Sequence, residues 1–340
     1  MSSSIKSRLL PALVAALNGI ALAQLPEFKI DIPDGTSQSG YIQFGHSVAI
    51  DGDYAVVASY SEEIDGQDHK GAAYVYKRNG SSWELEQKLT VPNSDLIQYN
   101  ILGSSVDIDG NSIVLGATNG TSGGSGNTLE GAAFVFVRDG TTWSQQGRLV
   151  ETNPQMSSGG GYKNYFGRTV AISGDYVIMG AHYDNGNGTS PNNKSNQGAA
   201  VIFVRSGTTW SEQQEIFAND PASNDQFGYN VDIDGDYAIV GSYADDDGAT
   251  NAGSAYIFKR SGTTWSQEDK INAFNGGDAD QDAKENTMFG QWVAIDGDYA
   301  VAGRRNGYGT QDYDYTYVFK RDNTDWNGEA VFEPGNGDID

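Results

Sequence analysis

The chain has 340 residues, of which 44 are glycine and 8 are proline; 11% are aromatic and only 19% are charged. This turn-rich composition excludes a coiled coil or a charged disordered tail. The formal net charge of −24 disfavours nucleic acid and anionic membrane surfaces as partners and favours cations and basic partners. The absence of cysteine excludes disulfides, thiol nucleophiles and thiolate metal sites.

Residues 1–23 have the features of a secretory signal peptide. Lys6 and Arg8 precede an apolar run over residues 9–22, and residues 21–23 form an A-x-A cleavage pattern. A membrane anchor is the alternative, which the short and interrupted apolar run disfavours. We therefore expect a secreted, soluble domain over 24–340, with a charge of −24 − 2 = −26. Secretion would make the chain a candidate glycoprotein, with N-x-[ST] sequons at Asn79, Asn119, Asn187 and Asn193.

The chain repeats one pattern five times. Each repeat begins at a Phe-Gly pair or a variant of it, near residues 44, 102, 166, 227 and 289. Within a repeat we expect four strands, a to d. In the first repeat they are "SVAID", "YAVVA", "AAYVYK" and "WELEQKL". Tight Asp-Gly, Asn-Gly or Ser-Gly turns join a to b and c to d, and Asn-Gly and Asp-Gly favour two-residue hairpins.

Strand b is apolar on both faces, which predicts burial between stacked sheets. No segment shows a helical apolar period. Together these features predict an all-β fold, a β-propeller of four-stranded antiparallel blades, with five repeats making five blades. The N-terminal "EFKIDIPD" is similar to the end of a strand d and could pair with the last blade. The C-terminal "WNGEAVF" competes for that place, so one strand is surplus or the ring is open.

The Phe-Gly and Gly-Ala pairs, such as Phe44-Gly45 and Gly71-Ala72, resemble those of the FG-GAP repeat family, the unit of the integrin-like α-chain propeller. The resemblance spans about residues 28–332 and implies an N-terminal-type propeller of extracellular and cell-adhesion proteins. The family often carries a calcium loop between strands a and b, whereas a two-residue turn stands there in this chain. The family's proline after Gly-Ala is also replaced, by Tyr60, Thr118, His182, Tyr243 and Arg305.

The connections between strands differ between the two faces of the predicted propeller. The a–b and c–d turns are tight, and the b–c and d–a connections on the opposite face are long and variable. Because loops on a rigid scaffold usually carry function, we place function on the side of the long connections, here called the loop face.

Two acidic segments of the loop face are candidate calcium ligands. The d–a connection before the fifth repeat holds Asp278, Asp280 and Asp282, and the fourth b–c connection holds Asp245 and Asp247. Alternating carboxylates can turn several oxygens toward one calcium ion. The glycine that an EF-hand-like pattern needs after the third aspartate is absent, so a solvated acidic rim is the alternative.

The fifth b–c connection gathers cations and aromatics in an otherwise acidic chain. Tyr and Arg are enriched at binding hot spots, and exposed aromatic rings suit sugar faces. The alternative is that a terminal repeat has drifted. The ligand-binding candidates are Arg304, Arg305, Tyr308, Tyr313 and Tyr315, with Trp292 in strand a of the same repeat.

The sequence gives little support for catalysis. The "GTSGG" at 120–124 lacks the strand-to-helix context of a nucleophile elbow, and the three histidines form no zinc pattern. We predict a non-enzymatic, secreted binding or adhesion module that presents its loop face to an extracellular protein or glycan, without nucleic acid or membrane insertion. The alternatives are an extracellular polysaccharide hydrolase or lyase and a structural matrix or coat protein.

Overall fold

The computed structural model describes residues 2–5, 30, 43–64, 70–92, 100–119, 131–152, 164–186, 193–273, 285–305 and 314–332. Five sheets follow one another along the chain, and each contains one blade of four antiparallel strands; the first sheet has β1 as an additional, parallel strand. The first blade contains β2 (Phe44–Asp51), β3 (Tyr54–Ser59), β4 (Ala72–Asn79) and β5 (Ser82–Leu89). The second contains β6 (Asn100–Asp109), β7 (Ser112–Asn119), β8 (Ala132–Asp139) and β9 (Thr142–Leu149).

The third blade contains β10 (Val170–Ser173), β11 (Tyr176–Ala181), β12 (Ala199–Ser206) and β13 (Thr209–Ile216). The fourth contains β14 (Asn230–Asp234), β15 (Tyr237–Ser242), β16 (Ser254–Ser261) and β17 (Thr264–Ile271). The fifth contains β18 (Trp292–Asp296), β19 (Tyr299–Arg304), β20 (Tyr315–Asp322) and β21 (Asp325–Phe332). The predicted fold class, an all-β propeller of five four-stranded blades, is confirmed.

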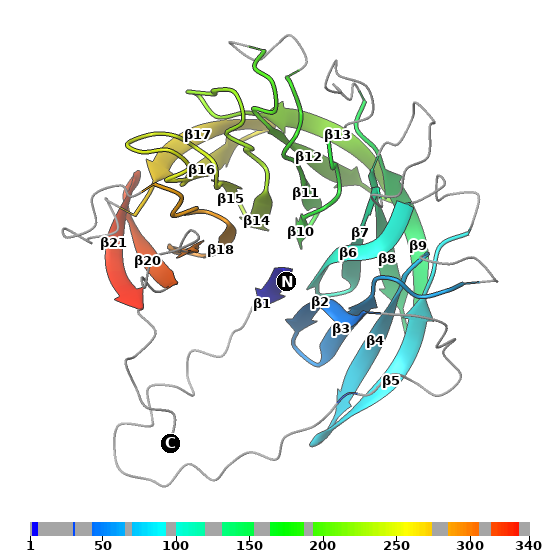
Figure 1. Ribbon diagram of the computed structural model, residues 1–340. Helices are drawn as coiled ribbons and strands as arrows, with labels where there is room; N and C mark the ends of the chain where they lie inside the picture. The colour runs from blue at the N-terminus through cyan, green and yellow to red at the C-terminus, as the bar shows by residue number, and fades with distance from the viewer. Residues whose placement is uncertain are drawn as a thin grey trace, which may run out of the picture.

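The blades are arranged around a common axis, with strand a of each blade innermost and strand d outermost (Figure 1). Figure 1 shows an open side between the fifth blade and the first, and no strand pairing joins these two blades among the described residues. The sequence left undecided whether one strand is surplus or the ring of blades is open. Among the described residues the ring is open.

The core consists of the apolar layers between neighbouring blades. Successive residues of a strand point to opposite faces, so Phe134 packs toward the first blade whereas Val135 packs toward the third. This alternation explains why strand b, such as β3 and β15, is buried along its whole length. The predicted burial of strand b between stacked sheets follows directly from this packing.

From the second blade on, each Phe-Gly pair or its Leu-Gly variant contacts the Gly-Ala or Gly-Ser pair of the preceding blade. Gly228 has φ +88°, and a Cβ there would lie 2.0 Å from the carbonyl oxygen of Ala199. The reciprocal Gly198 has φ +87°, and its Cβ would lie 1.9 Å from the carbonyl oxygen of Phe227. The two dipeptides are therefore glycine-rich because two backbones from adjacent blades meet there without room for a side chain.

A repeated side-chain contact also joins the outer parts of neighbouring blades. The guanidinium of Arg138 lies 4.2 Å from the ring centre of Tyr54 on the preceding blade, and its Nη1 donates to the Tyr54 hydroxyl. The ring of Trp143 packs edge-on against the same tyrosine at 6.0 Å. Tyr237 meets Arg321 and Trp326 in the same way between the last two blades. The tryptophan near the start of strand d, here Trp143 and Trp326, thus contacts the preceding blade.

Two N-terminal pieces lie against the first blade. Ile30 packs on a layer of the first blade formed by Val57, Ala72, Tyr74 and Tyr76. In every other blade the corresponding face packs against the preceding blade. Ile30 is the described residue of "EFKIDIPD", and it packs on the first blade. The sequence had suggested that this segment could pair with the last blade. The strand β1 (Ser2–Ile5) pairs in parallel with β2 and falls within the segment expected to be cleaved.

Candidate functional site

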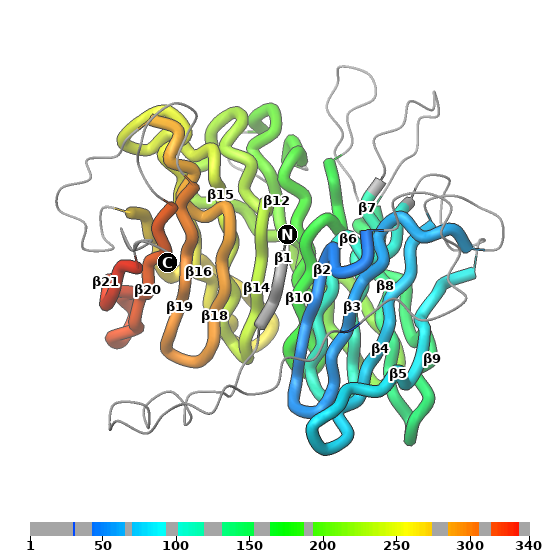
Figure 2. Tube along the Cα trace, turned by 60° about the horizontal axis from the view of Figure 1, so that its bottom comes forward, coloured from blue at the N-terminus to red at the C-terminus, as the bar shows by residue number. Residues whose placement is uncertain are grey.

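The two faces of the propeller differ as expected. Figure 2 shows the tight turns, such as those joining β2 to β3 and β18 to β19, along one side and the long connections along the other. Of the predicted site residues, Tyr308 and Tyr313 and the aspartates 278, 280 and 282 lie outside the described residues. The remaining predicted residues can be placed one by one.

Asp245 and Asp247, predicted as calcium ligands, both contact Lys270. The lysine Nζ lies 2.8 Å from an Asp245 carboxylate oxygen and 2.5 Å from one of Asp247, and Tyr256 donates its hydroxyl to Asp245 at 2.9 Å. Burial would raise the pKa of Asp245, but the hydrogen bond and charge of Lys270 outweigh it and lower that pKa. The ammonium group of Lys270 therefore pairs with both carboxylates, and also with Asp220.

The described candidates of the fifth blade are spread over different environments. Arg304 ends β19 and is only 2% exposed, with its Nη1 3.5 Å from the Tyr317 hydroxyl. Tyr315 is half-buried, and its ring centre lies 5.3 Å from the Arg304 guanidinium. Arg305 is exposed. Arg304 and Tyr315 thus form a packed pair rather than a cation offered to solvent.

Trp292 is 40% exposed and lines a cavity of about 290 Å³ on the inner side of the fifth blade. Its ring lies over Gly303, 3.4 Å from the position of a Cβ there. At the same repeat position, Ser47, Ser105 and Asn230 accept hydrogen bonds from the backbone of the next blade. Because the fifth blade is not followed by another along the described chain, its tryptophan side chain faces this cavity instead. The cavity is lined among others by Asn230, Asp232, Val301 and Thr316.

A cluster of aromatic side chains that the sequence did not single out lies on the loop face near the axis. Two repeat positions supply most of it: the residue after each Phe-Gly and the residue after strand b. Both positions adjoin the inner strands a and b, so they bring different blades together. We call the following residues the axial cluster: His46, Tyr60, Tyr165, Arg168, His182, Tyr183, Tyr229 and Tyr243.

Ring contacts join the axial cluster across blades. His182 of the third blade packs against Tyr229 of the fourth with ring centres 5.2 Å apart, and Tyr229 packs against Tyr243 at 4.4 Å. On the first blade His46 stacks on Tyr60, also at 4.4 Å. Ring contacts therefore join the third and fourth blades, and the His46–Tyr60 stack of the first blade lies within electrostatic reach of Arg168.

Arg168 is the cation of the axial cluster. Its Nη2 donates to the Tyr229 hydroxyl at 3.1 Å, its Nη1 lies 3.4 Å from Nε2 of His182, and the guanidinium lies 4.5 Å from the Tyr229 ring centre. Burial, with a further contribution from the Arg168 charge, lowers the pKa of His182 well below its usual value. His182 is thus neutral at pH 7, and Arg168 carries the positive charge.

Comparison with known proteins identifies the repeat. A family model described as the FG-GAP repeat matches residues 36–76, 143–203 and 210–258. These three regions of the chain carry FG-GAP repeats. No curated protein matches it. Among solved structures it is similar to a structural-genomics protein from Lactobacillus plantarum, at 12% identity and a TM-score of 0.46, over 83% of this chain and 67% of that one. No helix among the described residues is long and apolar enough to cross a membrane.

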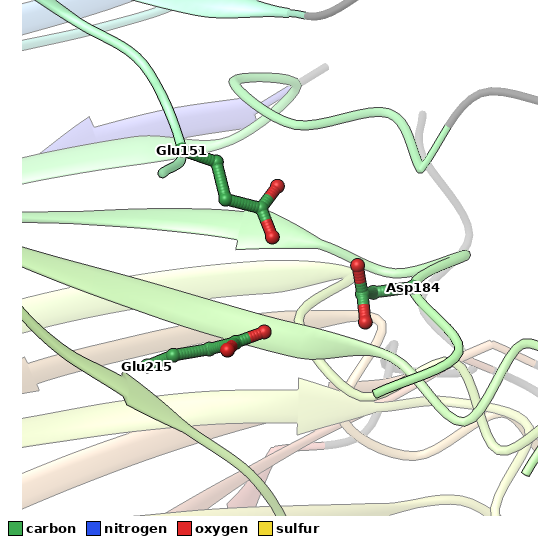
Figure 3. A group of neighbouring side chains, drawn as sticks. All are labelled: Glu151, Asp184 and Glu215. Atoms are coloured by element: carbon green, nitrogen blue, oxygen red, sulfur yellow. The ribbon is translucent and has the colours of Figure 1, made fainter. Parts of the chain in front are cut away.

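One FG-GAP blade carries a carboxylate cluster that the sequence analysis missed. Glu151, Asp184 and Glu215 come from the end of the second blade and from the third, and their carboxyl groups point toward one another (Figure 3). One oxygen of each lies within 4.8 Å of the others. Asn164 donates to Glu151 at 2.6 Å, and the Gly186 amide donates to Asp184 at 2.5 Å. Oxygen donors of this kind could hold a hard cation such as calcium.

The repeat shows how unusual this cluster is. In the first FG-GAP blade Lys88 pairs with Glu62 at 2.5 Å, and in the fourth Lys270 pairs with Asp245 at 2.8 Å. Glu215 and Asp184 occupy these two positions in the third blade, so an acid replaces the lysine. Burial, followed by the charges of Asp184, Glu151 and Glu212, raises the pKa of Glu215 to about 9. Comparing equivalent positions across repeats would have revealed this change from the sequence.

The carboxylate cluster does not resemble a glycosidase site. Asp184 is 0% exposed and Glu151 is buried, so a polymeric substrate has no access to them in the described structure. Paired catalytic carboxylates must instead flank a bound sugar. The axial cluster, of which every member except His182 is partly exposed, is the better candidate for contact with a ligand.

Proposed function

We propose that this FG-GAP propeller is a secreted binding module that holds an extracellular glycan or protein against its axial cluster. The observation that carries the proposal is the convergence of half-buried tyrosine rings and one arginine from three blades on the loop face. Tyrosine and arginine dominate binding hot spots because they combine a large contact area with a polar group. Of the two ligand classes, the ring faces suit a glycan.

The chemistry of the axial tyrosines supports binding. The tyrosines Tyr60, Tyr183 and Tyr243 have pKa values raised mainly by burial, so they remain neutral phenols at pH 7. Neutral phenols can donate and accept hydrogen bonds with sugar hydroxyls while their rings pack on the sugar face. Such a surface binds without changing its ligand.

A glycan array tests the proposal. We expect the purified protein to bind a defined set of glycans, and the double variant Tyr229→Ala/Tyr243→Ala to lose at least tenfold in affinity, because each ring contributes about 1 kcal/mol or more to the contact. Array signal, followed by titration calorimetry with the best glycan, measures the change.

The matched control is Tyr299→Ala, which removes an exposed tyrosine at the tight-turn end of the fifth blade and should leave binding unchanged. Loss of binding in Tyr308→Ala/Tyr313→Ala with full binding in Tyr229→Ala/Tyr243→Ala would move the site to the fifth b–c connection. A blank array would contradict glycan binding.

A further inference from the structure

We propose that the axial cluster recognises a glycan through a carboxylate group, held by Arg168. This inference rests on the proposed binding function and names the chemical class of the ligand: a sugar that carries a carboxylate, such as a uronic acid. It follows from the charge of Arg168, from its lack of an acidic partner among the described residues and from the neutrality of the described groups around it.

Arg168 differs from the arginines that the repeat uses for structure. In strand c of four blades an arginine pairs with an aspartate on the tight-turn side. Examples are Arg78 with Asp53 at 2.5 Å and Arg205 with Asp175 at 2.7 Å. No carboxylate of the described residues forms such a pair with Arg168. Arg138, the strand c arginine of the second blade, donates to Asn111 and Tyr54 instead and joins two blades. Arg168 lies among partly exposed rings at the inner strands, where its charge can serve a ligand.

The guanidinium is positioned but not saturated. A guanidinium has five N–H donors in a planar fork. Nη2 uses one on the Tyr229 hydroxyl, and Nη1 lies beside His182, so donors remain for a second acceptor. The guanidinium also lies 4.5 Å from the ring centre of Tyr229, and this contact restricts the orientation of its plane. A fork held in this way can bind both oxygens of one carboxylate.

The neighbouring groups neither compete with nor repel a carboxylate. Burial is the main cause that lowers the pKa of both His46 and His182, so both imidazoles are neutral near pH 7. The remaining members of the axial cluster are tyrosines. One cation on a platform of neutral rings therefore fits one acidic group on an otherwise uncharged body.

The composition of the cluster favours a sugar over an acidic peptide. It contains ring faces and hydroxyl groups and no aliphatic side chain, which matches the alternating C–H faces and hydroxyls of a sugar. The strong negative charge of the whole chain would repel a densely acidic peptide or polyanion from a distance. A single carboxylate on a neutral chain avoids most of this repulsion.

An array of matched acidic and neutral glycans tests the inference. Each uronic acid is paired with the neutral sugar that has a hydroxymethyl group in place of the carboxylate. We expect the purified protein to prefer the acidic member of its best pair by roughly tenfold, the scale of a charge-assisted bidentate contact. Arg168→Gln should equalise the two members, and Arg168→Lys should keep part of the preference because its charge remains without the fork.

Arg78→Gln is the control, since it removes a paired arginine on the opposite face and should preserve the preference. Binding that Tyr229→Ala/Tyr243→Ala abolishes, without acid preference and without loss in Arg168→Gln, would overturn this inference and leave the binding function standing. An array without any signal would overturn both. Arg168-dependent binding of an Asp/Glu hexapeptide, with no glycan bound, would overturn the sugar assignment.

Discussion

Gly228→Ala is expected to lower the free energy of unfolding by roughly 3 kcal/mol, the sum of a backbone cost and a steric cost. The backbone at this residue has φ +88°, which disfavours any L side chain. The new Cβ would also lie 2.0 Å from the carbonyl oxygen of Ala199, and neither backbone can move without separating two blades. Urea denaturation of the purified variant measures the loss.

Gly45→Ala provides a matched control at the same repeat position. Its φ of +81° is nearly the same, but no atom lies within 4 Å of a Cβ there. This variant should lose only the backbone part, about 1–2 kcal/mol. Equal losses in the two variants would show that the contact between the Phe-Gly and Gly-Ala pairs adds no constraint.

Glu215 is expected to make the protein less stable as the pH rises. Its folded-state pKa of about 9 lies above its ordinary value of 4.5, so the folded state binds the proton more tightly than the unfolded state. The resulting stabilisation is fully present below pH 4.5 and is lost as the pH rises through about 9. Glu215→Gln removes the titrating group. At a pH of about 9 and above, the melting temperature of this variant should therefore exceed that of the wild type by several degrees.

Glu215→Lys extends this experiment by installing the residue that the first and fourth blades have at this position. Its ammonium should pair with Asp184, as Lys88 pairs with Glu62, and so raise the melting temperature across the whole pH range. The control is Glu84→Gln, an exposed acid on β5. Parallel melting curves for wild type and Glu215→Gln over this pH range would refute the assignment.

The fold was accessible from the sequence because its signals are local and repeated. Asp-Gly turns, two-sided apolar strands and the Phe-Gly and Gly-Ala pairs recur from blade to blade with few variants, so one interpretation explains all five. The structure adds the reason for the two dipeptides, since Gly198 and Gly228 meet across two blades. That contact joins residues of separate repeats and could not be inferred from one repeat alone.

The candidate site was less accessible because it is assembled across repeats. Arg168 and Tyr229 belong to different blades, and only the propeller geometry brings them into contact. Asp245 was predicted as a calcium ligand without its partner Lys270, which lies on β17, 25 residues further along the same repeat. Arg304 belongs to a segment predicted as an exposed binding loop, yet it is the last residue of β19 and is 2% exposed.

The open side of the ring makes the propeller a linear array with two unlike ends. At one end Ile30 covers the first blade, whereas at the other Tyr299 is 40% exposed and Phe332 is 61% exposed. In such an array each blade is stabilised by its own fold and by its nearest neighbours. Among the described residues the fifth blade has one neighbouring blade and no covering segment, so we expect unfolding to begin there and to travel toward the N-terminus.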